Sequence, residues 1–126
     1  MTDNYIPERN HIVWLDFDPV KGKEIGKYCS ALVLSSSQYS SKSGLVICCP
    51  ISTSIRGGVT EVKVKNLGSP SVVAASLIQT LSWKDRKVKF ASIAEDGVMD
   101  DVLLRLIPLL GADQLIERIV NEQLQD

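Results

Sequence analysis

The chain has 126 residues, of which 44% are hydrophobic and 23% are charged, and its formal net charge is -1. This length and composition predict one domain, residues 1–126, with an ordinary hydrophobic core and without a segment long enough to cross a bilayer. The N-terminus lacks the basic and apolar pattern of a signal peptide, so we expect the cytoplasm to be the compartment.

The near-neutral charge hides two electrically different parts. Residues 1–94 contain 12 basic and 7 acidic residues, whereas residues 95–126 contain 2 basic and 8 acidic residues. We expect a polyanion to bind the first part, and RNA is the polyanion that fits. The acidic tail is expected to contribute nothing to RNA binding and could simply keep the protein soluble.

Three cysteines, Cys29, Cys48 and Cys49, are too few and wrongly placed for a disulfide framework or a zinc site. Cys48 and Cys49 are adjacent on a predicted strand, so their side chains should point to opposite faces. We expect free thiols, and we expect no metal and no cofactor. The single histidine, His11, stands at the start of a strand, where exposure is expected.

The first predicted strand is Ile12–Asp18, and its two carboxylates, Asp16 and Asp18, are expected to lie together at the open end of the strand. Its odd-numbered residues Val13, Leu15 and Phe17 should face the core, while the even-numbered residues share the opposite face. Pro19 cannot donate to a sheet ladder and should end the strand. Residues 20–27 then form a loop with three lysines, two glycines and one glutamate, a composition that favours phosphate binding.

The middle of the chain contains further short strands. Ala31–Leu34 is apolar without alternation and is expected to be a central strand, and Leu45–Ile51 is the clearest strand pattern. Thr60–Lys65 alternates, with Val62 and Val64 inward. Residues 72–75 and 77–83 are also expected to be strands.

Two segments between these strands are polar. Ser35–Ser43 contains six serines and is predicted to be a turn-rich loop anchored by Tyr39. Lys84–Lys89 concentrates charge, and it is expected to be either a solvated hairpin or a contact for a nucleic-acid backbone.

From Glu95 the apolar residues recur at helical spacing, which predicts an amphipathic helix that Pro108 should kink or end. Gly111 separates this helix from a second one, for which Asp113 is the expected cap. The second helix carries one apolar stripe, formed by Leu115, Ile116, Ile119 and Val120. Many short strands followed by helices predict a small antiparallel barrel, about 10–93, with a helical part at about 95–125.

Three motifs in this order resemble the MazF/PemK family of toxin ribonucleases. They are the run Val13–Glu24, the strand Ala31–Ser35 and the segment Gly44–Thr53. The resemblance covers residues 5 to about 110 and implies an SH3-like barrel with a C-terminal helix. It also implies a sequence-selective endoribonuclease for single-stranded RNA that works without metal and is neutralised by an antitoxin.

The resemblance implies the roles of three positions. Glu24 matches a glutamate near the family's active site and would act as the base, with Lys23 keeping it ionised. Ser52 replaces a family threonine and would donate a hydrogen bond to a phosphate oxygen, with Thr53 as the alternative hydroxyl. Cys29 stands, with Ser30, where the family has Arg-Pro, and a thiol offers neither the charge nor the forked donors of arginine.

A second departure from the family is Ser76-Leu77, where related toxins tend to have Asp-Gln. It affects the expected recognition of the substrate. Lys27 is the nearest cation that could replace the missing guanidinium. Phosphate contacts are expected from six basic residues: Lys21, Lys23, Lys27, Arg56, Lys84 and Arg86.

Three functions stay open at this point. The first is the ribonuclease toxin, and the second is a catalytically weak or inactive relative that binds RNA or antitoxin as a decoy or regulatory module, which Cys29 favours. The third is a toxin that poisons a protein such as gyrase. The expected partners are single-stranded RNA, an antitoxin with an acidic segment, DNA only through that antitoxin, and no membrane. A homodimer is expected to form through sheet edges and the terminal helices, with Leu103, Leu106, Leu110, Ile116 and Ile119 as its apolar surface.

Overall fold

A computed structural model of the chain describes residues 4–17 and 28–125. The loop residues Lys21, Lys23, Glu24 and Lys27 lie outside the described residues, as does Asp18. None of the described helices combines the length and the apolar character that crossing a membrane would need.

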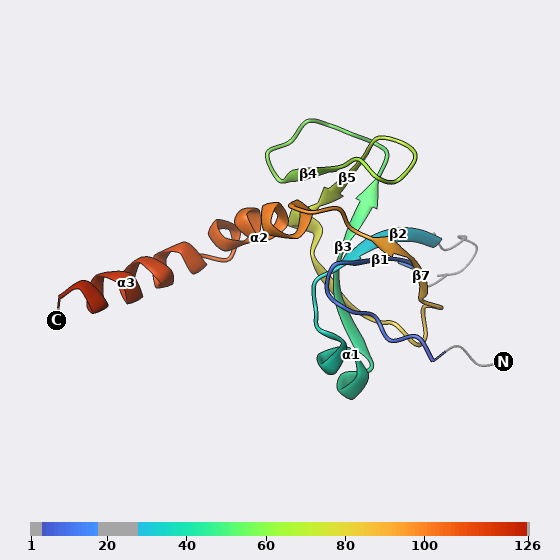
Figure 1. Cartoon of the computed structure of the whole chain (residues 1–126), viewed down its shortest axis with the longest axis horizontal. Helices are drawn as coiled ribbons and strands as arrows, with labels where there is room; N and C mark the ends of the chain where they lie inside the picture. Colours follow the sequence, from blue (N-terminus) through green and yellow to red (C-terminus); the bar gives the residue numbers. More distant parts are fainter. Residues whose placement is uncertain (1–3, 18–27, 126) are drawn as a thin grey trace, which may run out of the picture.

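Within these described ranges, seven strands form one curled antiparallel sheet in the order β4-β5-β3-β2-β1-β7, with β6 paired to β3 (Figure 1). The strands are β1 His11–Asp16, β2 Tyr28–Val33, β3 Leu45–Ser52, β4 Glu61–Val64, β5 Ser71–Ala74, β6 Gln79–Ser82 and β7 Lys89–Ile93. The helices are α1 Ser37–Ser43, α2 Val98–Leu109 and α3 Ala112–Leu124, and a short 3-10 turn covers Ala75–Leu77. The expected architecture of antiparallel strands followed by C-terminal helices is therefore present.

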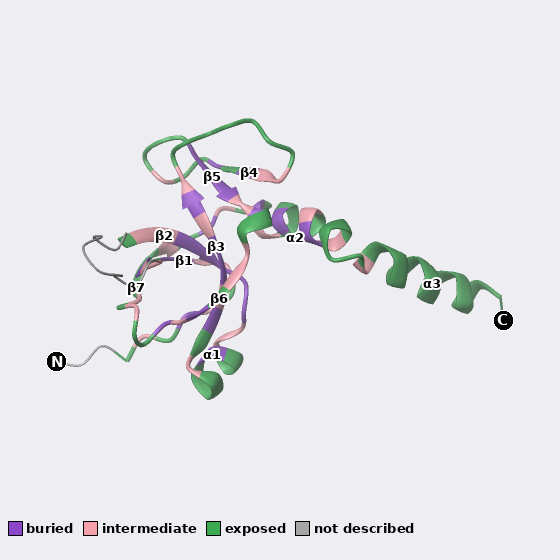
Figure 2. Cartoon of the chain, turned by 180° about the vertical axis from the view of Figure 1, so that it is seen from behind, coloured by how far each residue is buried: buried purple, intermediate pink, exposed green. Residues whose placement is uncertain are grey.

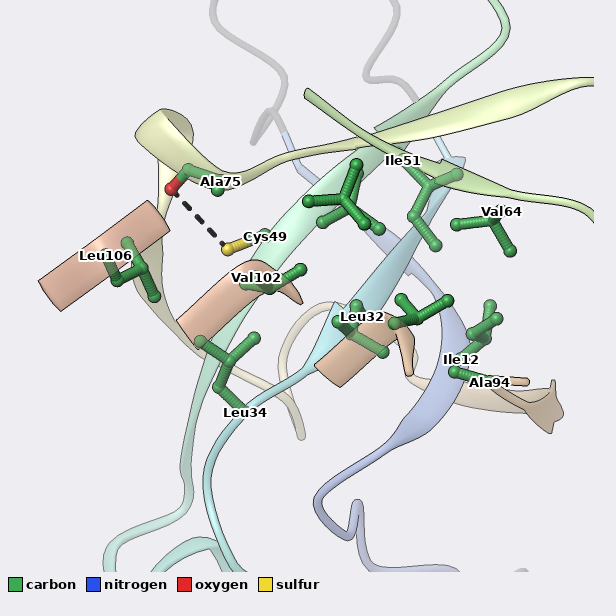
Figure 3. Close-up of a cluster of buried hydrophobic side chains, with 13 residues drawn as sticks. Ile12, Leu32, Leu34, Cys49, Ile51, Val64, Ala75, Ala94, Val102 and Leu106 are labelled. Carbon is green, nitrogen blue, oxygen red and sulfur yellow. Dashed lines mark hydrogen bonds between the residues drawn. The ribbon is translucent and has the colours of Figure 1, made fainter. Parts of the chain in front are cut away.

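The core has two parts, one on each side of the hairpin β1–β2. The barrel-side core contains Val13, Leu15, Ala31, Val33, Val46, Cys48, Leu81 and Trp83, and Phe17 packs against it. The helix-side core contains Ile12, Leu32, Cys49 and Ile51 together with residues of β4, β5 and α2 (Figure 3). Strand alternation sends Cys48 and Cys49 into different parts, as predicted, and all three cysteines are free.

The helix-side core explains one difference from the sequence pattern. Ile12 shares a face of β1 with exposed Trp14, yet Ile12 is fully buried. Ile12 lies beside Ala94 in the helix-side core, to which β4, β5 and α2 also contribute. Trp14, two residues further along β1, does not belong to that core and is exposed.

Ser35–Ser43 is not the predicted loop, because it contains α1. The hydroxyl of Ser36 accepts a hydrogen bond from the backbone N–H of Tyr39 and caps the helix, and Gly44 ends it with a left-handed backbone, φ 74°. Tyr39 is 38% exposed, and its side chain makes no hydrogen bond to another described residue. Ser40 is instead fully buried, and its carbonyl accepts a hydrogen bond from the indole N–H of Trp83 at 2.9 Å.

The remaining boundaries differ from the pattern in smaller ways. β6 starts at Gln79, after the 3-10 turn, and β7 was not predicted because its residues are almost all exposed. α2 contains Pro108 and ends one residue later at Leu109. Gly111 is the residue before α3, and Asp113 lies inside the first turn and does not cap the helix.

Leu106 corrects the predicted dimer surface. Its side chain is 4% exposed and packs in the helix-side core, so it cannot contribute to an interface between copies. The other four members of that surface, Leu103, Leu110, Ile116 and Ile119, are exposed in this chain.

Candidate active site

A pocket of about 400 Å³ lies where the end of β3 meets the segment that follows β5. Hydroxyl groups dominate its polar lining, from Ser52, Ser54, Thr60 and Ser76. The Arg56 side chain adds a cation. Hydroxyls and a guanidinium are groups that bind phosphate oxygens, because each offers hydrogen-bond donors to an anion.

Ser52 reaches this pocket because β3 changes partners along its length. β3 pairs with β2 as far as Ala31↔Pro50, and its last residues pair with β5, where Ser52 lies opposite Val72. The hydroxyl of Ser52 accepts a hydrogen bond from the backbone N–H of Ser54 at 2.9 Å. This bond uses a lone pair, so the hydroxyl proton is still available for donation to a ligand.

Glu61 organises the loop that carries Arg56. Its carboxylate accepts backbone N–H bonds from Arg56, at 3.2 Å to each oxygen, and from Gly57 at 2.8 Å. Gly57 has φ 77°, a conformation that glycine adopts without strain. The carboxylate therefore shapes the loop, and it adds a negative charge to the same pocket lining as Arg56.

Ser52 and Arg56 were predicted as site residues and Ser76 as part of a departure from the family, and all three line this one pocket. Thr60 and Glu61 were missed as site residues. The Thr60 hydroxyl lies 3.4 Å from that of Ser76, which joins the two walls. In the sequence, Thr60 and Glu61 were marked only by their position, because they begin a strand directly after a glycine turn.

Cys29 is half-buried in β2, opposite Leu15 of β1. Alternation places its side chain on the face of Ala31 and Val33, which belong to the barrel-side core. The same alternation along β3 assigns Ser52 to the face of Cys48. Position 29 and Ser52 therefore share a face, although the β2–β3 ladder ends at Ala31↔Pro50.

Lys84 and Arg86 lie elsewhere, in the turn between β6 and β7. The Lys84 ammonium is 5.5 Å from the centre of the Trp83 ring. One guanidinium nitrogen of Arg86 donates to the carbonyl oxygens of Asp16, at 3.0 Å, and of Phe17. Arg86 thus ties the end of β1 to this turn, and neither residue lines the hydroxyl-rich pocket. His11, expected to be exposed, is partly buried, with its Nδ1 2.8 Å from the Tyr5 hydroxyl.

Comparisons with known proteins agree with the motifs. Residues 8–110 match the family model described as PemK-like, MazF-like toxin of type II toxin-antitoxin system. The endoribonuclease toxin MazF of Escherichia coli K12 is 33% identical over 86 residues, which cover 68% of this chain and 78% of that protein.

Solved structures show the same relationship. MazF of Deinococcus radiodurans is 36% identical with a TM-score of 0.77, covering 86% of this chain and 99% of that one. A MazE-MazF structure from the same organism is also 36% identical, with a TM-score of 0.80, covering 86% and 98%. These matches confirm the predicted barrel-like fold, and the chain belongs to the PemK-like, MazF-like toxin family of type II toxin-antitoxin systems.

Proposed function

We propose that the protein is a toxin endoribonuclease that cleaves single-stranded RNA sequence-selectively and without metal. The observation that carries the proposal is the pocket in which the Ser52 hydroxyl, further hydroxyls and Arg56 converge. A relative covering two thirds of this chain is an endoribonuclease, which supports the same reaction. The chemistry asks one group to accept the 2′-hydroxyl proton while donors stabilise the phosphate.

In this proposal each residue has a defined task. Glu24 accepts the proton of the 2′-hydroxyl, and Ser52 donates a hydrogen bond to a phosphate oxygen. Position 29 is where a cation would stabilise the negative charge of the transition state, and a neutral thiol there cannot do so. We therefore expect slow turnover, because losing one such donor typically lowers the rate by about 10² to 10³.

The cytoplasm is the proposed compartment, and an antitoxin with an acidic segment is the proposed protein partner. A structural relative is solved as a MazE-MazF assembly, and residues 1–94 of this chain carry the excess of basic residues. DNA would be reached only through the antitoxin. We also propose a homodimer, for which exposed Leu103, Leu110, Ile116 and Ile119 offer apolar surface.

A second candidate function rests on Cys29 itself. A member of this family with a thiol in place of the guanidinium could keep the binding surface and lose the reaction, acting as an RNA-binding or antitoxin-binding module. The two functions differ in one measurable property, the rate of RNA cleavage after a positive charge is restored at position 29. The enzyme regains its rate, and the binding module does not.

The decisive experiment compares single-turnover cleavage of a mixed-sequence single-stranded RNA, in chelator, by the parent and by Cys29→Arg. We expect the rate to rise by about 10² to 10³. Cys29→Ala should cleave like the parent if the thiol is inert, and adding Glu24→Ala to Cys29→Arg should abolish the gain. A folded Cys29→Arg protein without increased cleavage would favour the binding module.

Binding is tested separately by titrating the same RNA at several salt concentrations. The logarithm of the binding constant should fall with the logarithm of salt by a slope of about -0.7 for each phosphate neutralised. Charge reversal of Lys21, Lys23 and Lys27 should weaken binding. No binding at low salt, or unchanged binding after the reversal, would contradict the assignment of these lysines.

A further inference from the structure

An exposed aromatic pair stands on the hairpin β1–β2. Trp14 and Tyr28 are diagonal neighbours across the two strands, since Trp14 pairs with Ser30 and Asp16 pairs with Tyr28. Their ring centres are 6.2 Å apart and their planes differ by 15°. Trp14 is 42% exposed and Tyr28 is 43% exposed, so both rings form part of the outer surface.

The Tyr28 ring is anchored. Its hydroxyl donates a hydrogen bond to the carbonyl oxygen of Lys87 at 2.9 Å, which holds the strand to the turn before β7. A tyrosine phenol is protonated at neutral pH, and partial burial and the negative charge of Asp16 raise the pKa of Tyr28 further. Because its hydroxyl is held in one position, the Tyr28 ring stays parallel to the Trp14 indole. This hydrogen bond leaves the outer surface of the two rings uncovered.

Two lysines lie near this pair in the sheet, and Asp16, the cross-strand partner of Tyr28, adds one carboxylate on the same face. Lys89 is the cross-strand partner of Trp14 on β7, and Lys87 supplies the carbonyl that binds Tyr28. Both lysines are exposed. Flat aromatic surface next to cations is the combination that binds single-stranded nucleic acid, because the bases stack on the rings and the phosphates attract the ammonium groups.

The pair and the candidate active site occupy different faces of the hairpin. Trp14 belongs to the even-numbered face of β1, whereas Leu15 and its partner Cys29 belong to the barrel-side face. A base on the pair would therefore belong to a nucleotide away from the phosphate that Ser52 contacts. Such a contact would change RNA affinity and leave the chemical step unchanged.

We propose that Trp14 and Tyr28 form a stacking platform for one base of the bound single-stranded RNA. The proposal rests on the proposed function, since it names a further part of the substrate that the same protein holds. It assigns Trp14 to positioning of the substrate and gives it no part in proton transfer. Stacking tolerates any base, so the platform adds affinity more than sequence preference.

Fluorescence tests this placement, because the chain has two tryptophans and Trp83 is buried. The probe is a mixed-sequence octaribonucleotide with 2′-O-methyl groups, which cannot be cleaved. Its partner is an abasic octamer with the same number of phosphates. We expect the octamer with bases to quench tryptophan emission and the abasic octamer not to do so. The quenching should be absent in Trp14→Phe, which leaves only Trp83.

Affinity and kinetics give the second readout. Trp14→Ala should bind the base-containing octamer roughly 5- to 100-fold more weakly and the abasic octamer equally well. Trp14→Phe keeps a ring and should lose less. With a cleavable RNA, KM should rise in Trp14→Ala while kcat stays unchanged. Circular dichroism and thermal unfolding confirm that each variant is folded before it is compared.

Three outcomes would overturn the inference. If Trp14→Ala is folded and binds both octamers like the parent, the pair only stabilises the hairpin, as cross-strand aromatic pairs do. If the variant loses self-association and keeps RNA binding, the pair is a protein interface. If the parent itself binds no RNA at low salt, the proposed function fails as well, and this outcome is distinct from the first two.

Discussion

The two C-terminal helices have similar amphipathic sequences but different surroundings. α2 buries Val98, Val102 and Leu106 against the sheet, and α3 buries no residue at all. Figures 1 and 2 show α2 on the sheet and α3 extending away from it, exposed along its length. The family match ends at residue 110, so α3 begins just after the shared part. An apolar stripe thus predicts that one face of a helix is to be buried, but it does not predict which part of a protein covers that face.

The two helices also differ in how much tertiary packing stabilises them. A helix of 13 residues is marginal in water unless packing supports it, and among the described elements α2 is the main neighbour of α3. Leu115, Ile116, Ile119 and Val120 form the predicted stripe, and each is about half exposed. Four experiments measure the contrast between the buried core of the barrel and the exposed helix α3.

The largest expected effect concerns the cysteines, which report how well the barrel is sealed. Burial raises the pKa of Cys48 and of Cys49 to about 12, so at pH 8 only roughly 10⁻⁴ of each thiol is ionised. Half-buried Cys29 should be labelled first by a thiol reagent in the native protein, with the other two reacting only after unfolding. Labelling of all three at one rate in folded protein would show an open core.

The next effect compares two leucines. Leu32 is fully buried in the helix-side core and Leu124 of α3 is 77% exposed. Leu32→Ala should lower the free energy of unfolding by about 2–5 kcal/mol, through lost burial and the cavity left behind. Leu124→Ala should change it by less than about 0.5 kcal/mol. Urea unfolding of both variants, at several protein concentrations, makes the comparison, and equal losses would contradict it.

Removal of α3 sharpens the comparison further. A chain ending at Gly111 should keep the fold of the barrel, because α3 buries nothing, and it should self-associate about tenfold more weakly if α3 covers its stripe with a second copy. Light scattering over a dilution series measures association, and circular dichroism checks the fold. An unfolded truncated protein would mean that the barrel depends on α3.

The smallest effect is expected at Glu8, the first residue of the stretch that matches the family model. Glu8 accepts hydrogen bonds from the backbone N–H of Arg9 and from the backbone and hydroxyl of Ser37, and these bonds lower the pKa of its carboxyl group. A lowered folded pKa means that the stabilisation is complete above the ordinary value of 4.5 and disappears as the pH falls through the lowered value.

Glu8→Gln should therefore melt slightly below the parent at pH 7, and the two should converge at acidic pH. Thermal unfolding from pH 7 to pH 3 measures the difference. Asp113→Asn, in the exposed first turn of α3, is the control and should leave the melting temperature unchanged. A difference that persists at pH 3 would show that Glu8 acts through something other than its charge.

Sequence alone determined the features that depend on local pattern. The alternation along β3 predicted that Cys48 and Cys49 face opposite sides, and that along β4 predicted buried Val62 and Val64. These predictions hold because successive side chains of a strand point to opposite faces whatever surrounds it. Ser52, through the family resemblance, and Arg56, through its charge, were predicted as site residues, and both line one pocket.

Tertiary structure decided what lies against each face. Ile12 is buried and Trp14 is exposed on one face of one strand, because only Ile12 belongs to the helix-side core that β4, β5 and α2 complete. Arg86 donates to backbone carbonyls at the end of β1, a use that its sequence neighbours do not predict. The pocket joins Ser52 and Arg56, at and just after the end of β3, with Ser76, which follows β5. Burial and site geometry depend on which distant segments meet, and short-range periodicity carries no information about that meeting.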